Sequence, residues 1–223
     1  MLYVVATPIG NLEDITLRAI STLKNADFIL SEDTRVTGKL LHHFEIDTPM
    51  ISFHEYSEDS KYDKIIELLS DGKNLALVTD AGTPAISDPG YFLVQTIRKR
   101  LPEVKISPIP GASAITALVS VSGINMKEFT FLGFPPHKKG RKTFFEHIIE
   151  TAAKNPVIFY ESKHRVIKAI ESIRELAPEK ELVVGREITK MFEEIVTGTA
   201  NEILEHFSQN SNNLKGEFVI IIS

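Results

Sequence analysis

The stretch Ser31-Glu32-Asp33-Thr34-Arg35 places two carboxylates, two hydroxyls and a guanidinium within five residues. Groups of these types serve general acid–base chemistry and the stabilisation of developing charge. The same cluster is equally typical of a helix cap with a salt bridge. The sequence leaves both interpretations open at this point, and the elements that hold the cluster decide between them.

The stretch Leu75–Gly90 is more informative about function. It opens with the apolar run Leu75–Thr79, which is typical of a buried strand in a sheet covered on both faces. The Gly and Pro residues that follow forbid regular structure and leave the backbone accessible. Ile86 lies among them, an apolar residue with no helix or strand to join. Because α/β sheets bind ligands in loops that follow strands, this stretch predicts a ligand-binding loop.

Two further loops follow predicted strands. Thr7–Leu12 comes directly after the first apolar run, and Pro110–Ala114 precedes a predicted helix whose first N–H groups are available to a ligand. The first of these loops also fits a simple turn before a helix capped by Asp14 or Thr16. Together with Ser31–Arg35 and the loop after Leu75–Thr79, they predict a binding pocket more strongly than any one loop alone.

A basic segment stands out from this acidic chain. Lys138, Lys139, Arg141 and Lys142 surround Gly140, whereas the formal net charge of the whole chain is −5. Such runs are most often solvated loops. The alternative is a loop that contacts phosphates, because basic side chains supply most of the affinity for nucleic acid.

Several classes of site are not expected. None of the twelve glycines has the spacing of a G-x-G-x-x-G dinucleotide fingerprint or of a P-loop. The seven histidines form no metal-binding pair on a helix, cysteine is absent, and no metal is expected. No apolar run approaches the roughly 20 residues of a membrane span, and no signal peptide is recognisable. We therefore expect a cytoplasmic protein without a membrane partner.

Strand-like and helix-like segments alternate regularly in the first half of the chain, which predicts right-handed crossovers and a mostly parallel sheet. The expected strands are Leu2–Ala6, Asp27–Ser31, Met50–Phe53, Leu75–Thr79 and Lys105–Ile109. The expected helices are Thr16–Lys24, Val36–Phe44, Lys61–Leu69, Tyr91–Arg100 and Ala112–Val121.

The second half has strands closer together in sequence, which predicts hairpins and a mixed sheet. The expected strands are Phe129–Gly133, Val157–Tyr160, Leu182–Arg186, Glu194–Thr197 and Phe218–Ile222, and the expected helices are Phe144–Ala153, Val166–Leu176 and Asn201–Phe207. We predict two α/β domains, residues 1–118 and 119–223.

Seven motifs resemble those of the bacterial 16S rRNA (cytidine-2′-O)-methyltransferases, members of the tetrapyrrole methylase superfamily. They are T-P-I-G-N-L (Thr7–Leu12), S-E-D-T-R (Ser31–Arg35), D-A-G-T-P-x-I-S-D-P-G-Y (Asp80–Tyr91), P-G-A-S-A (Pro110–Ala114), F-Y-E-S-x-H-R (Phe159–Arg165), R-E-x-T-K (Arg186–Lys190) and K-G-E (Lys215–Glu217). The resemblance runs along the whole chain and implies two α/β domains with S-adenosylmethionine in the cleft between them.

The resemblance also implies roles for individual residues. It implies that the cofactor is contacted by Ile9, Gly10, Gly82, Thr83, Ile86, Ser113 and Ala114, with Tyr160 as a wall from the second domain. It implies that the groups nearest the ribose are Asn11, Glu32, Arg35, Glu187 and Lys190. A carboxylate such as Glu32 would accept the hydroxyl proton, with Arg35 or Lys190 stabilising the oxygen or a phosphate.

The partner that the resemblance implies is 16S rRNA in the small ribosomal subunit, methylated in its decoding region, with the basic segment contacting phosphates. Superfamily members resemble one another in forming homodimers, so a homodimer is expected. Two alternatives stay open. One is a methyltransferase of the same superfamily that acts on a small tetrapyrrole-like substrate, and the other is a non-catalytic RNA-binding assembly protein. Acceptance of the methyl group by a porphyrinoid would establish the first, and absence of cofactor binding would establish the second.

Overall fold

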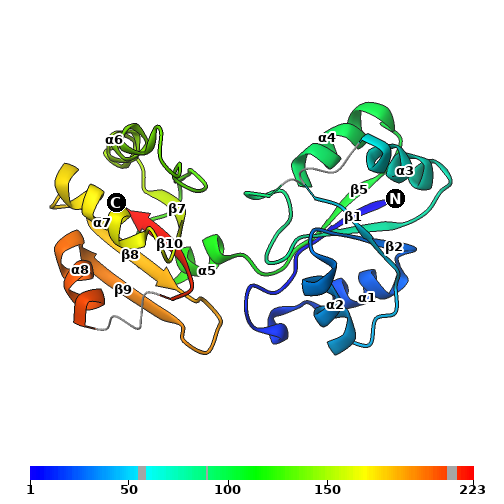
Figure 1. The fold of residues 1–223 in the computed structure, drawn as a ribbon, viewed down its shortest axis with the longest axis horizontal. Coiled ribbons are helices and arrows are strands. Elements are labelled where there is room, and N and C mark those ends of the chain that lie inside the picture. The colour runs from blue at the N-terminus through cyan, green and yellow to red at the C-terminus, as the bar shows by residue number, and fades with distance from the viewer. Residues whose placement is uncertain (55–58, 89, 210–214) are drawn as a thin grey trace. The chain divides into compact units, whose positions relative to one another are not determined.

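A computed structural model describes residues 1–54, 59–88, 90–209 and 215–223. The chain divides into two compact units, Met1–Ser113 and Ala114–Ser223 (Figure 1). The expected boundary after residue 118 lies inside a helix, α5 (Ala114–Val121), which the structure assigns to the second unit. Each unit is described below by itself.

The first unit is built on a five-stranded sheet in the order β3-β2-β4-β1-β5. Its strands are β1 (Leu2–Val5), β2 (Phe28–Ser31), β3 (Met50–Ser52), β4 (Leu75–Val78) and β5 (Ile106–Ile109). All four strand pairs are parallel, so every strand ends at the same edge of the sheet. All four residues of β4, the central strand, are buried, as its uninterrupted apolar sequence predicts.

Helices cover both faces of this sheet. They are α1 (Leu17–Asn25), α2 (Thr34–His43), α3 (Asp59–Ser70) and α4 (Gly90–Arg100), together with the short 3-10 helix η1 (Leu12–Asp14). One core cluster joins α1 and α2 to the sheet through Ala19, Leu23 and Leu41. A second cluster joins α3 and α4 to the opposite face, where Leu93 and Ile97 are fully buried. Figure 1 shows these helix pairs on either side of the strands.

The second unit is built on a mixed five-stranded sheet in the order β6-β7-β10-β8-β9. Its strands are β6 (Thr130–Phe131), β7 (Val157–Ser162), β8 (Glu181–Arg186), β9 (Glu194–Thr199) and β10 (Glu217–Ile222). Only the β6–β7 pair is parallel; the other three pairs are antiparallel. The expected strand at Phe129–Gly133 is reduced to two residues because only these two pair with β7.

Three helices pack on one face of the second sheet. They are α6 (Arg141–Ala152), α7 (Val166–Leu176) and α8 (Ala200–Gln209). Their apolar sides form one core with alternate residues of β7, β8 and β10, including the buried Phe145, Phe159 and Phe207. Helix α5 also contacts this sheet, since Leu118 Cδ1 lies 2.9 Å from the position of a Cβ at Gly185.

Every helix and strand expected from the sequence occurs in the structure, with ends that differ by a few residues. The largest difference concerns the start of α6, which was expected at Phe144 and lies at Arg141. Arg141 and Lys142 are therefore helical, not part of a loop.

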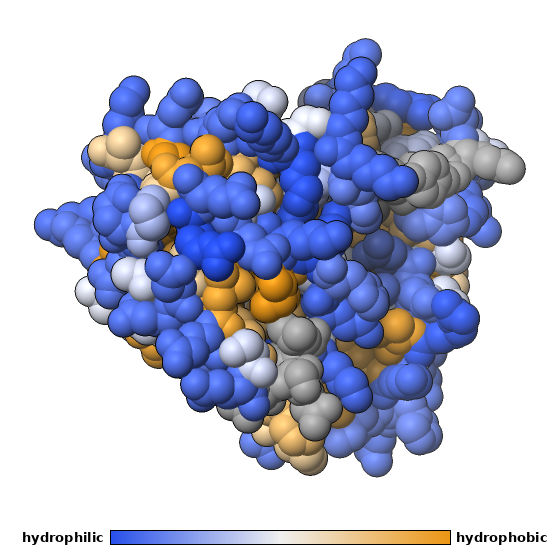
Figure 2. Space-filling model, turned by 60° about the vertical axis from the view of Figure 1, so that its left-hand side comes forward, coloured by the Kyte–Doolittle hydropathy of each residue, from blue (hydrophilic) through white to orange (hydrophobic). Residues whose placement is uncertain are grey.

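On the face that Figure 2 displays, hydrophilic residues predominate and hydrophobic residues form small separate patches. Among the described residues, no helix is both long and apolar enough to cross a membrane.

Candidate active site

The central strand of the first sheet marks the place for a ligand. The connections after β1 and β2 lead to α1 and α2 on one face, whereas the connection after β4, which lies between them, leads to α4 on the other face. In open parallel sheets, ligands bind outside the carboxyl ends of the strands where neighbouring connections separate in this way. The loop after β4 is therefore the expected ligand loop on topological grounds as well.

Three of the loops at this edge are joined to one another. Thr7 and Gly82 exchange two backbone hydrogen bonds, of 2.9 and 3.1 Å, which connect the loop after β1 to the loop after β4. The hydroxyl of Thr83 donates a hydrogen bond of 3.2 Å to the carbonyl oxygen of Ala112, in the loop after β5. The structure thus brings together loops for which the sequence predicts a common pocket.

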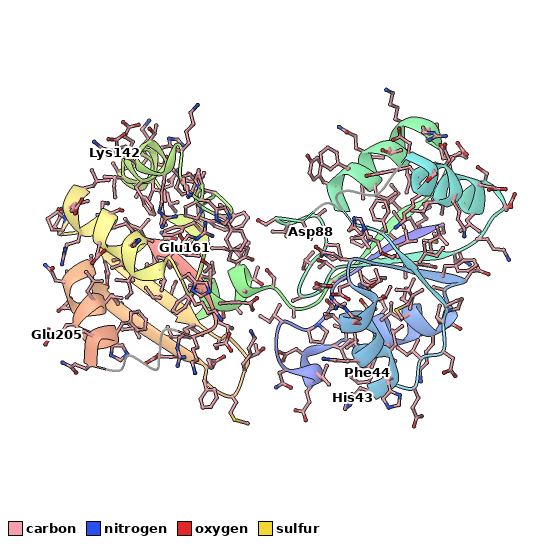
Figure 3. All side chains as sticks on the ribbon, in the orientation of Figure 1. His43, Phe44, Asp88, Lys142, Glu161 and Glu205 are labelled. Carbon is pink, nitrogen blue, oxygen red and sulfur yellow. The ribbon has the colours of Figure 1, made fainter. Side chains whose placement is uncertain are left out.

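The loop after β4 has an unusual backbone. Gly82 has a φ of +83°, and a Cβ there would lie 3.3 Å from Ile9 Cγ2. Ala85 and Ser87 also have positive φ angles, 71° and 63°, which non-glycine residues rarely adopt. Asp88 braces this conformation, because its Oδ1 accepts hydrogen bonds of 2.8 Å from the N–H groups of Ala85 and Gly90 (Figure 3). Strained backbone of this kind concentrates at ligand sites.

Apolar and small residues complete this edge. Ile86, between the two strained residues, is 40% exposed although it is apolar. Gly10 is exposed and Ile9 is half-buried. Ser113 and Ala114, both half-buried, stand at the junction between the loop after β5 and α5. These residues supply what an uncharged ligand portion needs, namely apolar surface and backbone groups.

The Ser31–Arg35 cluster separates into two arrangements. Glu32 Oε2 accepts a hydrogen bond of 2.8 Å from the hydroxyl of Thr79, whose carbonyl oxygen in turn accepts one of 3.2 Å from Thr7. Asp33 caps α2 and forms the ion pair with Arg35, at 2.6 Å, with the Arg35 side chain 87% exposed. The salt-bridge interpretation therefore holds for Asp33 and Arg35, and Glu32 is held instead by a neutral donor.

The carboxylates at this edge influence one another. Burial raises the pKa of Asp88, and the neighbouring Glu32 acts in the same direction. Burial also raises the pKa of Asp80, whose Oδ1 accepts a hydrogen bond of 3.1 Å from the Asp33 N–H. By contrast, the hydrogen-bonded Arg35 guanidinium lowers the pKa of Asp33 to about 2. The negative charge at Glu32, Asp80 and Asp88 favours a cationic ligand over an anionic one.

Asn11 and Thr16 have local structural roles. The Asn11 side chain caps η1 by accepting a hydrogen bond of 3.1 Å from the N–H of Glu13. Thr16, not Asp14, caps α1, because its hydroxyl oxygen accepts a 3.0 Å hydrogen bond from the Ala19 N–H. The interpretation of Thr7–Leu12 as a turn before a capped helix is therefore correct. The same loop also lies at the carboxyl edge of the sheet.

In the second unit, Glu187 and Lys190 form a triad with Glu217. The Lys190 ammonium donates to Glu187 Oε1 at 2.9 Å and to Glu217 Oε2 at 2.8 Å. The N–H of Glu217 donates to Glu187 Oε1 at 3.0 Å, so the motifs R-E-x-T-K and K-G-E meet here. Gly216, with a φ of +108°, passes so close that a Cβ would overlap the Glu187 side chain. Glu187 and Thr189 themselves have positive φ angles, of 49° and 67°.

The triad keeps Glu187 and Lys190 charged. Burial alone would lower the pKa of Lys190, but its hydrogen bonds to Glu217 and Glu187 outweigh burial and raise that pKa. Burial alone would raise the pKa of Glu187, but hydrogen bonds from Lys190 and from the Glu217 N–H outweigh it and lower that pKa. Lys190 is thus a fixed cation at neutral pH and is not suited to act as a base.

Tyr160 belongs to an aromatic cluster on β7. Its ring centroid lies 5.2 Å from those of both Phe131 and Phe134. Burial, with a smaller contribution from Glu217, raises the pKa of Tyr160 to about 12. Tyr160 is therefore a neutral aromatic group at any physiological pH.

The basic segment is only partly available to a partner. Lys138, Lys139 and Lys142 are exposed. The structure corrects the expectation for Arg141, whose guanidinium donates to Glu161 Oε2 at 2.7 Å. The Glu161 side chain is fully buried on β7 (Figure 3), and its other oxygen pairs with Arg165 at 3.0 Å. Arg141 fastens the segment to the second unit, so its charge is already neutralised.

Sequence reasoning assigned no role to four residues that contact the candidate site groups or their neighbours. They are Thr79, Asp88, Glu161 and Glu217. All four lie within or beside the quoted motifs, and this position is the signal that could have identified them. Their partners are distant in sequence or in another element, so the motif letters alone did not identify the contacts.

The fold resembles that of solved methyltransferases. The structure resembles the methyltransferase CobJ with a TM-score of 0.69 at 16% identity, covering all of this chain and 93% of that one. It resembles cobalt precorrin-4 methyltransferase with a TM-score of 0.66 at 18% identity, covering 99% of this chain and 93% of that one. At these identities the likeness defines the fold alone.

The sequence comparison defines the family. The model of the Tetrapyrrole (Corrin/Porphyrin) Methylases matches residues 1–204, so this chain belongs to that family and is a methyltransferase. Three relatives are named Ribosomal RNA small subunit methyltransferase I. The chain is 44% identical over 222 residues to that of Neisseria meningitidis serogroup B, covering 99% of this chain and 75% of the relative. The chain is 43% identical over 225 residues to the relative from Bacillus subtilis, covering 100% of this chain and 74% of that relative. It is 45% identical over 227 residues to the relative from Streptococcus pyogenes serotype M3, covering 100% of this chain and 76% of that relative.

Proposed function

We propose that this methyltransferase modifies 16S rRNA of the small ribosomal subunit, at the 2′-oxygen of a cytidine ribose, with S-adenosylmethionine as methyl donor. The names of the relatives, and a similarity that spans 99–100% of this chain and 74–75% of theirs, support the class of substrate. Glu32 carries the chemical part of the proposal, because it is a carboxylate at the carboxyl edge that is held by the Thr79 hydroxyl instead of a cation.

The residues at this edge fit such a methyl donor. Glycine at position 82 keeps the backbone close to Ile9, and Ile86 offers exposed apolar surface. The carboxylates of Glu32, Asp80 and Asp88 favour a positively charged group. S-adenosylmethionine supplies an electrophilic methyl group on a cationic sulfur. We propose that it is held by Ile9, Gly10, Gly82, Thr83, Ile86, Ser113 and Ala114, with Tyr160 as a further apolar contact.

The chain's own residues then act on the ribose hydroxyl. Glu32 accepts the hydroxyl proton on its carboxylate, while the Thr79 hydrogen bond fixes the orientation of that carboxylate. Arg35, whose exposed guanidinium pairs with Asp33, stays a prediction for a group that stabilises the ribose oxygen. Asn11, Glu187 and Lys190 are still predicted to lie near the ribose. The homodimer is a separate prediction. Lys138, Lys139 and Lys142 are proposed to contact rRNA phosphates.

The test is methyl transfer from tritiated S-adenosylmethionine to small ribosomal subunits that lack the modification, followed by nuclease mapping of the label. We expect label on one cytidine of 16S rRNA, in a dinucleotide resistant to alkali because its 2′-oxygen is blocked. Label on a base would contradict the 2′-oxygen assignment. Transfer to a porphyrinoid and not to the subunits would favour the small-substrate alternative.

A further inference from the structure

A groove on α4 of the first unit extends beyond the groups discussed above. It has a volume of about 520 Å³ and is lined by Ala85, Tyr91, Val94, Gln95, Arg98 and Lys99. Five of these residues come from successive turns of one helix face, and Ala85 comes from the strained loop after β4. The groove therefore begins at the candidate ligand loop and continues along α4.

One end of the groove is aromatic. Tyr91 is 50% exposed and Phe92 is 39% exposed, although both carry large apolar rings. Their ring centroids lie 3.9 Å apart with an interplanar angle of 32°. Tyr91 is also the last residue of the D-A-G-T-P motif stretch, and the proposed chemistry gives it no role. An exposed aromatic surface of this kind offers a platform on which a nucleobase stacks.

The other end of the groove is basic. Arg98 and Lys99 form no ion pair with any residue that the structure describes, whereas their neighbour Arg100 pairs with Asp63 at 2.7 Å. Tyr91 and Arg98 are seven residues apart on the helix, which corresponds to about 10 Å. An aromatic surface followed at this distance by unpaired cations matches the alternation of base and phosphate in a single strand of nucleic acid.

We propose that this groove binds single-stranded rRNA next to the modified nucleotide, with a base stacked on Tyr91 and phosphates held by Arg98 and Lys99. The proposal rests on the proposed function and deepens it, since it assigns a second RNA contact besides the basic segment. The acidic edge near Glu32 disfavours phosphates, so the strand needs cations elsewhere on the same unit, and α4 provides them.

The test measures binding of small ribosomal subunits over a series of salt concentrations. The variants are Tyr91→Ala, Tyr91→Phe and the double variant Arg98→Gln/Lys99→Gln. The matched control is Lys24→Gln/Lys39→Gln, which removes the same charge from exposed positions on α1 and α2, at the other face of the sheet. Melting curves for all variants distinguish a loss of contact from a loss of structure.

We expect Tyr91→Ala to weaken binding roughly ten-fold or more, the size of one lost base stack, and to raise the KM for subunits, while Tyr91→Phe binds like the wild type. The Arg98/Lys99 variant is expected to lower the slope of log affinity against log salt by about 1.4, for two phosphate contacts. Affinity for S-adenosylmethionine is expected to stay unchanged in both.

Three results overturn the proposal. If Tyr91→Ala and the Arg98/Lys99 variant bind subunits as tightly as the Lys24/Lys39 control, the two cations only stabilise the end of α4 and the groove is not an RNA site. If the wild type sediments as a dimer that Tyr91→Ala dissociates, the groove receives a second copy of the chain. A wild type that neither binds nor methylates small subunits overturns the proposed function as well, which distinguishes that failure from the first two.

Discussion

At the carboxyl edge of the first sheet, Glu32 and Asp88 are held by neutral donors, whereas Glu161, Glu187 and Glu217 of the second unit are held by cations. Glu32 accepts from the Thr79 hydroxyl and Asp88 accepts from two backbone N–H groups. In the second unit, Glu161 is paired with two arginines, and Lys190 with two carboxylates. At this edge Asp33, which pairs with Arg35 at the surface, departs from the contrast.

The difference separates groups that are ready for chemistry from groups that maintain structure. A carboxylate whose charge is not neutralised by the protein can attract a cationic ligand or accept a proton. A carboxylate buried between guanidinium groups is already satisfied, and its removal leaves those charges uncompensated. We therefore propose Glu32, rather than Glu187, as the proton acceptor.

The largest effect on stability is expected from Glu161→Gln. The change leaves Arg141 and Arg165 in part-buried positions without their carboxylate, and breaking a buried pair in this way costs about 3–5 kcal/mol. Urea unfolding measures the loss. The matched control is Glu146→Gln, which breaks the exposed pair with Lys142 and is expected to cost no more than about 0.5 kcal/mol. Equal losses for the two variants would contradict the structural role of Glu161.

Glu32→Gln is expected to have the next largest effect, on activity instead of stability. Because the amide cannot accept a proton, single-turnover methyl transfer with saturating cofactor should fall by a factor of about 10² or more, with the melting temperature nearly unchanged. Glu187→Gln serves as the comparison, since loss of the pair with Lys190 should lower the melting temperature more than Glu32→Gln does. A Glu32→Gln variant with near-normal turnover would remove the contrast between the units.

Gly82→Ala is expected to weaken the binding of S-adenosylmethionine moderately. Gly72→Ala is the matched control. Both glycines have a φ near +80°, so either substitution should cost about 1–2 kcal/mol of backbone strain. A Cβ at Gly72 meets nothing within 4 Å, whereas one at Gly82 lies 3.3 Å from Ile9. Calorimetric titration should show weaker binding of S-adenosylmethionine for Gly82→Ala alone. The same affinity in both variants would place the cofactor away from this loop.

The smallest effect is expected from Tyr160→Phe, which should change the pH dependence of the free energy of unfolding only at high pH. The pKa of Tyr160 is about 12 in the folded chain, against about 10 for an unfolded tyrosine. The neutral phenol therefore contributes stability that is fully present below pH 10 and is lost as the pH rises toward 12. The free energy of unfolding of the wild type should fall more steeply over that window than that of the variant. Parallel pH profiles would show that Tyr160 is not buried.

The sequence alone predicted the elements of this protein and the loops that form its candidate site. Apolar runs such as Leu75–Val78 and caps such as Thr16 are local signals, because burial and capping depend on residues a few positions apart. The parallel sheet followed from the alternation of strands and helices, and parallel strands place the loops after β1, β4 and β5 at one edge.

Only the tertiary structure decided which charged groups are partners. Glu187 meets Glu217, thirty residues further on, because β8 and β10 pair in an antiparallel register. Arg141 points to Glu161 because α6 packs over β7, and Arg35 joins Asp33 and not Glu32 because Asp33 caps α2. Sequence periodicity specifies the face on which a side chain lies, but the partner across that face depends on strand register and helix packing between distant segments.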